Sequence, residues 1–358
     1  MRDELDERQA GLAAAVDRVA AAGGEPREVM ARLGDERLLA VHFPEEYGGR
    51  GLRLADHAAV CERIGALALP DVAHLVTVQA VGCSILESGT GGQRARWLPK
   101  IASGRLYASL LLSEPDAGTD LAAITTAATP DGDGWRIRGG KTWSLFTPWS
   151  RLALVSARTR EGASPYDGIS LFLVDPAAPG VTITPVPRAA GEPYHTVTFD
   201  DVGVGPDALL GRPHLGWRLL PRAIGFERAG FDYLSCATRW LAAAEREVRG
   251  LPEIRRRAMA ADLARLRFEV GNARAVAYHA VNSATRFAMD EFAVAYAKLV
   301  CGRAAQSVAR WAGLELGAGS GGVAAAVAEA PEFTISGGAQ ELQLDLIANE
   351  YPIGGALR

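Results

Sequence analysis

The sequence has few cysteines, and none of them lies in a metal-binding or redox pattern. The four cysteines are far apart and form no CxxC pair, and the six histidines are dispersed without an HExxH motif. The cysteines are Cys61, Cys83, Cys236 and Cys301. Widely separated thiols in a chain without a secretion signal are typical of a reducing compartment. The spacing therefore predicts free thiols and no metal site.

The chain also lacks a strong charge of either sign and a long apolar run. Its 38 Lys and Arg nearly balance 42 Asp and Glu, and no long basic run occurs, which argues against a nucleic-acid partner. No stretch is both long and apolar enough to span a membrane. The first residues, "MRDELDERQ", are charged and lack the apolar core of a signal peptide. We predict a cytoplasmic protein with no nucleic-acid or membrane partner.

The motifs of two large enzyme classes are missing as well. No GxSxG stretch marks a serine nucleophile, and no GxxxxGK[ST] loop is present to hold phosphates. Nucleophilic hydrolysis and phosphoryl transfer therefore have no support in the sequence.

Three stretches with different residue patterns follow one another along the chain. The first and last parts have apolar residues at helical spacing, whereas the middle has short runs of Val, Ile, Thr and aromatics separated by turn signals such as "PDGDG". We predict an α+β fold: an N-terminal helical domain, a central β-barrel or sandwich of about seven strands, and a C-terminal helical bundle of the four-helix type. The expected bounds are residues 1–108, 109–205 and 206–358. Within the last part, "AGSGGVAAAVAEAPE" is predicted to be a loop.

A carboxylate falls on an apolar stripe in the segment that starts near residue 220. This segment is either one long helix or a short piece followed by a long one. Leu220, Ile224, Glu227 and Phe231 recur at spacings of four, three and four, so a continuous helix would place them on one face. A carboxylate held among apolar side chains is suited to act as a general base near neutral pH. The alternatives are a buried salt bridge or a side chain that reaches water.

Three Gly-containing stretches are weaker candidates for ligand contacts. "SEPDAGTD", residues 113–120, follows an apolar strand, and its small residues let the backbone approach a flat ligand or a phosphate, although an acidic turn would look the same. "GGKTWSLF", residues 139–146, carries Trp143, which would stack beside a cofactor or pack in the core. "TISGGAQELQ", residues 334–343, contains a Gly-Gly pair that permits a sharp turn.

Taken together, the motifs resemble those of acyl-CoA dehydrogenases over nearly the whole chain. The matching stretches are "FPEEYGG", "LLLSEPDAGTDLAAI", "DGWRIRGGKTWSL", "VTFDDVGVGPDALLG" and "TISGGAQELQLDLIANE", in the family's order and at about its spacing. The resemblance implies bound FAD and an acyl thioester substrate, carried on coenzyme A or on an acyl carrier protein. It also implies an electron acceptor such as an electron-transfer flavoprotein, and assembly into a homo- or hetero-oligomer, dimer or tetramer.

The resemblance assigns roles to individual residues. Leu112 and Ser113 would lie along the flavin ring, Thr119 near the pyrophosphate or pantetheine, and Trp143 with Ser144 over the flavin. The remaining implied contacts are Ile335 with the cofactor and Arg228, Ser336 and Gly337 with the substrate.

The position of the catalytic base separates branches of this family. Many members carry it as the Glu of a Tyr-Glu-Gly-Thr stretch, where this chain has Ser336 and Gly337 in place of Tyr and Glu. In the branch that includes isovaleryl-type and long-chain enzymes, the base stands directly before an arginine in the long helix. This chain has Glu227 and Arg228 there, so Glu227 is the predicted base.

Several family features are missing, and they leave other functions open. Leu145 and Ala339 stand where hydroxyl residues usually contact FAD, and the Arg-x-x-Phe-Gly segment that clasps a neighbour's FAD has no match. One alternative is therefore a half-site or non-catalytic partner subunit of a heteromeric acyl-CoA dehydrogenase. Another is a flavin oxidase or monooxygenase with this fold.

Overall fold

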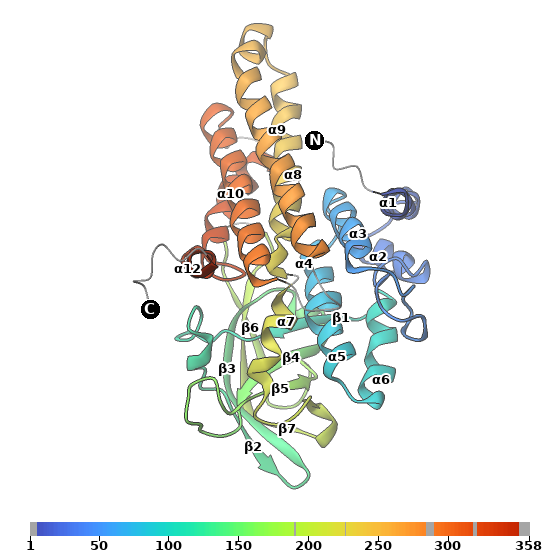
Figure 1. Ribbon diagram of the computed structural model, residues 1–358, viewed down its shortest axis with the longest axis vertical. Coiled ribbons are helices and arrows are strands. Elements are labelled where there is room, and N and C mark those ends of the chain that lie inside the picture. Colours follow the sequence, from blue (N-terminus) through green and yellow to red (C-terminus); the bar gives the residue numbers. More distant parts are fainter. Residues whose placement is uncertain (1–5, 190, 226, 284–289, 318–320, 351–358) are drawn as a thin grey trace.

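The computed structural model describes most of the chain, with short gaps. The described residues are 6–189, 191–225, 227–283, 290–317 and 321–350. The first helices lie beside a β-sheet, and the long helices of the last part rise from the same sheet (Figure 1). Helices, then strands, then helices is the order that the sequence predicts, and the α+β fold is confirmed.

The N-terminal helices form a small core of their own. Their bounds are α1 Glu7–Ala20, α2 Pro26–Asp35, α3 Leu54–Ala66, α4 Asp71–His74, α5 Cys83–Ser88 and α6 Gly91–Ala102, with a π-helical segment, η2, at Leu75–Gly82. The α1 helix starts where the Asp6 side chain accepts the N–H of Gln9, a reciprocal cap. Its buried face, including Leu12 and Val16, packs in a cluster with Leu33 of α2.

The strands join into one mixed sheet. Their bounds are β1 Tyr107–Leu111, β2 Ala127–Asp131, β3 Gly134–Ser144, β4 Ser150–Arg158, β5 Ile169–Val174, β6 Val181–Val186, β7 Tyr194–Val204 and β8 Leu209–Leu210. Their order is β6-β7-β3-β2-β4-β5-β8, and β1 pairs with β4 in parallel. The predicted hairpin turn is confirmed, because Asp131 pairs with Gly134 across a left-handed Gly132.

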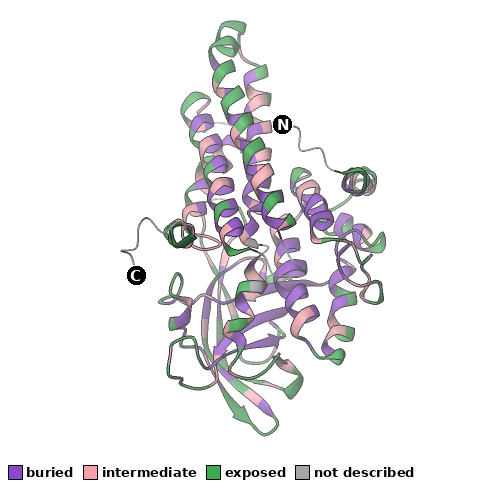
Figure 2. Cartoon of the chain, viewed as in Figure 1, coloured by how far each residue is buried: buried purple, intermediate pink, exposed green. Residues whose placement is uncertain are grey.

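The C-terminal part consists mainly of long helices. Their bounds are α7 Leu220–Gly225, α8 Phe231–Arg249, α9 Glu253–Asn282, α10 Glu291–Glu315, α11 Gly321–Glu329 and α12 Gln340–Glu350, with 3-10 turns η7 at Glu227–Ala229 and η8 at Ala330–Thr334. A large buried cluster joins α8, α9 and α10, and the rings of Trp240 and Phe333 stack 5.4 Å apart inside it. Figure 2 shows exposed residues at the free ends of α8 and α9 and buried ones where the helices face each other.

Two expectations about this part need correction. Of the two alternatives at residue 220, the short piece followed by a long helix is right: α7 ends at Gly225, and α8 begins after Gly230. Gly230 has φ +83°, and a Cβ there would lie 2.9 Å from Cβ of Cys301, so the break needs a glycine. The spacing of Leu220 and Glu227 thus spans a break and does not define one helical face. The predicted loop at 318–332 instead contains α11, since its Ala-rich run favours helix.

Two further sequence predictions can be compared with the structure. All four cysteines are free and buried, as their spacing predicts. Within the described part of the chain, no helix combines the length and apolar character needed to cross a membrane.

Candidate active site

The end of β1 is tied to β3 through backbone carbonyls. The Lys141 ammonium donates to the carbonyl oxygen of Leu112 at 3.0 Å, and the N–H of Thr142 donates to that of Ser113 at 2.9 Å. Leu112 is buried and Ser113 half-buried. Two of the predicted cofactor residues therefore lie next to the strand end that carries Trp143.

A buried ion pair supports the loop that follows. Lys141 Nζ lies 2.8 Å from Glu114 Oε1, and both side chains are almost completely buried. The Glu114 carboxylate also accepts the N–H groups of Thr125 at 2.7 Å and Thr126 at 2.9 Å. Burial by itself would raise the pKa of Glu114, but the Lys141 charge and these hydrogen bonds outweigh it and lower the pKa to about 2. Glu114 thus fixes the start of the 113–120 loop to the sheet.

At the end of β3, the indole of Trp143 faces solvent and the hydroxyl of Ser144 points inward. Trp143 is 56% exposed although it has φ +61°, a conformation that costs free energy in a non-glycine residue. Its ring packs edge-on against Tyr194 at 5.9 Å. Ser144 is buried, and its hydroxyl lies 2.7 Å from Thr147 Oγ1 and donates to the carbonyl of His195 at 3.2 Å. The Trp143 ring is thus accessible at the surface, whereas the Ser144 hydroxyl is hydrogen-bonded inside the β-sheet region.

An acidic residue links this strand end to the C-terminal turn. Glu332 in η8 accepts a hydrogen bond from the Tyr194 hydroxyl at 3.2 Å and from Arg188 Nε at 2.9 Å. Its own carbonyl accepts the N–H of Ile335 at 2.8 Å. Ile335 is 70% exposed. Trp143 and Ile335 therefore lie at two ends of one connected network.

A tyrosine side chain hydrogen-bonds to the Gly-Gly turn. The Tyr233 hydroxyl donates to the Ser336 carbonyl at 2.7 Å, and Gly337 and Gly338 follow with φ +64° and +101°. A Cβ on Gly337 would lie 2.6 Å from Tyr233 Oη. A Cβ on Gly338 would lie 3.7 Å from Arg228 Nη2, so the predicted substrate residues do come together. The turn needs glycine both for its backbone and for the space that Tyr233 occupies.

A buried lysine on α10 supports the same turn. Lys298 is 1% exposed, its ammonium donates to the Phe333 carbonyl at 3.0 Å, and it lies 5.5 Å from the centre of the Tyr233 ring. Burial lowers the pKa of Lys298 to about 8, and the nearby Arg228 acts in the same direction. Neither Tyr233 nor Lys298 was predicted as a site residue. A lysine inside the apolar run "AVAYAKLV" was the available signal for Lys298.

Two predicted residues stand apart from these contacts. Glu227 begins η7 directly before Arg228, and its side chain lies outside the described part of the structure. Thr119 is exposed on the loop after β1, and no hydrogen bond between described residues joins it to the others.

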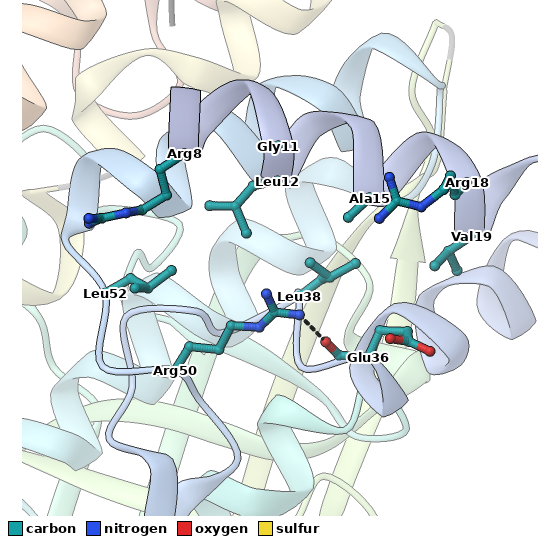
Figure 3. A pocket seen from close by; sticks show the side chains of 10 residues that line it. All are labelled: Arg8, Gly11, Leu12, Ala15, Arg18, Val19, Glu36, Leu38, Arg50 and Leu52. Atoms are coloured by element: carbon teal, nitrogen blue, oxygen red, sulfur yellow. Dashed lines mark hydrogen bonds between the residues drawn. The ribbon is translucent and has the colours of Figure 1, made fainter. Parts of the chain in front are cut away.

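A separate cavity of about 590 Å³ lies on α1 and contains none of the predicted site residues. Figure 3 shows Arg8, Arg18 and Arg50 around an apolar floor that includes Leu12 and Leu52. This cavity is therefore not the candidate active site.

The contact between Tyr233 and the turn makes a prediction about stability. We expect Gly337→Ala to lower the melting temperature more than Gly51→Ala does, because Gly51 has nearly the same φ, +63°, but nothing within 4 Å of the added Cβ. Strain alone costs about 1–2 kcal/mol in both variants. Tyr233→Phe removes the hydroxyl, so Gly337→Ala should cost less in that background. Equal costs for the two alanine variants would show that Tyr233 does not constrain residue 337.

Comparisons with known proteins agree with the fold. Models of the N-terminal, middle and C-terminal domains of acyl-CoA dehydrogenases match residues 1–105, 109–202 and 216–351. The chain is 35% identical over 232 residues to the acyl-CoA dehydrogenase IpdE1 of Mycobacterium tuberculosis H37Rv, a match that covers 64% of this chain and 59% of that protein. The chain thus spans about three fifths of that relative's length.

Solved structures share the fold over almost the full chain. A glutaryl-CoA dehydrogenase from Mycobacterium smegmatis in complex with FADH2 has a TM-score of 0.84 at 22% identity, covering 99% of this chain and 97% of that one. A chain of the ChsE4–ChsE5 complex from Mycobacterium tuberculosis has a TM-score of 0.84 at 25% identity, covering 98% of this chain and 100% of that one. With all three domain types matched in order, the chain belongs to the acyl-CoA dehydrogenase family.

Proposed function

We propose that this chain catalyses FAD-dependent α,β-dehydrogenation of an acyl thioester, with Glu227 as the base that removes the α-proton. The observation that carries the proposal is the meeting of η7 with the C-terminal turn. Arg228, next in the chain after Glu227, approaches Gly338, and Trp143 is connected to the same turn through Tyr194 and Glu332. Residues from the β-sheet, the α7–α8 junction and the C-terminus thus converge on one place.

The reaction requires two kinds of group from the protein. A carboxylate must accept the α-proton at one of its oxygens, and hydrogen-bond donors must stabilise the charge that develops on the thioester carbonyl. In this chain Glu227 would accept the proton. Gly337 has no side chain that could do so, and Tyr233 fills the space where one would start. When bound, FAD supplies the acceptor for the β-hydrogen and its electron pair.

The exposed apolar side chains fit a flat aromatic cofactor. Trp143 and Ile335 are large and 56% and 70% exposed, so both leave apolar surface that a flat group could cover. Trp143 would cover one part of the ring, and Leu112 and Ser113 at the end of β1 would line its edge. Ser144, Thr119 and Ile335 remain proposed as further contacts, and Arg228, Ser336 and Gly337 as substrate contacts.

The half-site partner subunit is the second candidate. Leu145 and Ala339 lack the hydroxyl groups with which many family members hold FAD. The similarity to a chain of the ChsE4–ChsE5 complex adds support, since that protein is a complex of two named components. In that case a second chain would complete the flavin site, and the three predicted segments, 1–108, 109–205 and 206–358, would still serve as its domains. A flavin oxidase or monooxygenase is the third candidate.

The visible spectrum of the purified chain separates these candidates. For the proposed function we expect a yellow protein with about one flavin per chain, bleached by an acyl thioester, with an enoyl thioester as product. A colourless chain that gains flavin only when a second protein is added would support the partner subunit instead. Peroxide or an oxygenated product without an enoyl thioester would identify an oxygen-using flavoprotein. The same assay, run with acyl-CoA and acyl carrier protein thioesters and with an electron-transfer flavoprotein, identifies the carrier and the acceptor.

A further inference from the structure

Two histidines and a cysteine that lie apart in the sequence meet inside the N-terminal helices. His57 and Cys61 are one turn apart on α3, and His74 ends α4. One nitrogen or sulfur atom from each lies within 4.8 Å of the other two. Their exposed fractions are 0%, 3% and 2%. The dispersed spacing predicts no metal site, but the fold gathers three side chains of the types that bind zinc.

Hydrogen bonding fixes how His57 faces this cluster. Its Nε2 lies 2.9 Å from the carbonyl oxygen of Leu39, and because a carbonyl only accepts, Nε2 carries the proton. The lone pair is therefore on Nδ1, which lies 3.3 Å from Cys61 Sγ. The Gln79 side-chain NH2 donates a hydrogen bond to the same Nδ1 at 2.5 Å, so a metal ion would have to displace it to use the lone pair. A backbone carbonyl that accepts the other ring N–H is the usual support of a metal-binding histidine.

One imidazole nitrogen of the cluster, and one of the neighbouring His42, are not satisfied by the protein itself. Nε2 of His74 is buried and, among the described residues, has no hydrogen-bond partner. The same holds for Nδ1 of His42, whose Nε2 lies 3.3 Å from Cys83 Sγ. A buried polar atom without a partner costs about 1–3 kcal/mol. A group of imidazoles and thiols with unmet polar atoms is more easily explained as a ligand site than as ordinary packing.

We propose that His57, Cys61 and His74 bind one zinc ion, which would replace the Gln79 amide at His57 Nδ1. Binding would convert the Cys61 thiol to a thiolate and release its proton to solvent. Bond lengths of about 2.0–2.3 Å to nitrogen and sulfur require ligand atoms about 3.3–3.8 Å apart, so the widest pair would close by about 1 Å. Side-chain rotation can provide such a change.

The ion would have a structural role. It would cross-link α3 to the α4–η2 segment, and η2 packs against β1 and η7. The zinc site would therefore stabilise the part of the N-terminal helices that packs against the candidate active site. None of the predicted flavin or substrate residues belongs to it, so its test does not depend on the proposed function.

Metal content and cobalt spectroscopy test this proposal. The full chain, purified without a histidine tag, should contain about one zinc per chain. After the metal is removed with a chelator, cobalt should give a thiolate-to-cobalt charge-transfer band, and zinc should raise the melting temperature. Cys61→Ser should lose the band and the stabilisation, whereas Cys301→Ser should keep both, because Cys301 is a buried thiol that contacts the Ala273 carbonyl.

His74→Gln provides a second variant in case Cys61→Ser does not fold, and it should also lose zinc. A parent chain that takes up no zinc, or whose cobalt complex lacks the thiolate band, would overturn the proposal. So would a band that persists in both Cys61→Ser and His74→Gln.

Discussion

Glu227→Gln is expected to slow flavin reduction by an acyl thioester by about two to four orders of magnitude, the usual contribution of a general base. The amide is nearly the same size as the carboxylate but cannot accept the α-proton. Bound flavin and the melting temperature should stay close to those of the parent, because the substitution keeps the side-chain volume and Leu220 and Phe231, which flank η7 in the sequence, are buried. The loss should therefore appear in the rate and not in the folding.

Two measurements make this test specific. Stopped-flow reduction of the flavin reports the complete reaction, whereas exchange of the α-proton in heavy water reports the base alone. Glu341→Gln is the matched control, since Glu341 is an exposed carboxylate in the first turn of α12, close in sequence to the Gly-Gly turn. Reduction and exchange at the parent rate in Glu227→Gln would mean that another group removes the proton. If the parent itself binds no flavin, exchange in the reconstituted complex is the measurement to use.

Much of this arrangement could be predicted from the sequence because it depends on local patterns. Alternating apolar runs and the Asp-Gly turn place the strands. The break between α7 and α8 was harder to predict, because the sequence allowed either one continuous helix or a short helix followed by a long one. Gly230 is the residue that makes it, both through its φ of +83° and because Cys301 on α10 leaves no room for a Cβ, and the second reason depends on tertiary packing.

The supporting residues could not be predicted in this way. Tyr233 contacts Ser336, and Lys298 contacts Phe333, across about a hundred and about thirty-five residues of chain. Such contacts follow from how α8 and α10 pack against the C-terminal turn, which no local pattern records. The convergence of His57 with His74 has the same origin, although the spacing of His57 and Cys61 on one helix face was visible in the sequence.

The second prediction with a large expected effect concerns the buried Lys141–Glu114 ion pair. We expect Lys141→Met to lower the free energy of unfolding by about 3–5 kcal/mol, because it leaves the Glu114 carboxylate buried without its counter-ion. The variant should also loosen the end of β1, since Lys141 holds the Leu112 carbonyl. Lys100→Met removes an exposed ammonium and is the matched control. Urea unfolding followed by circular dichroism measures both, and equal stabilities would show that the pair does not hold this strand.

The pH dependence tests the same pair independently of the size of the loss. In the parent, the pKa of Glu114 is lowered to about 2, so its contribution is complete above the unfolded value of 4.5 and disappears as the pH falls toward 2. Without Lys141, the buried carboxylate should have a raised pKa. The deficit of Lys141→Met should then be largest at neutral pH and shrink as acid protonates Glu114. Glu114→Gln removes that titration, so adding Lys141→Met to it should give a deficit that no longer shrinks in acid. A deficit that stays constant from neutral to acidic pH in the single Lys141→Met variant would mean that lost packing, and not an uncompensated charge, is what destabilises it.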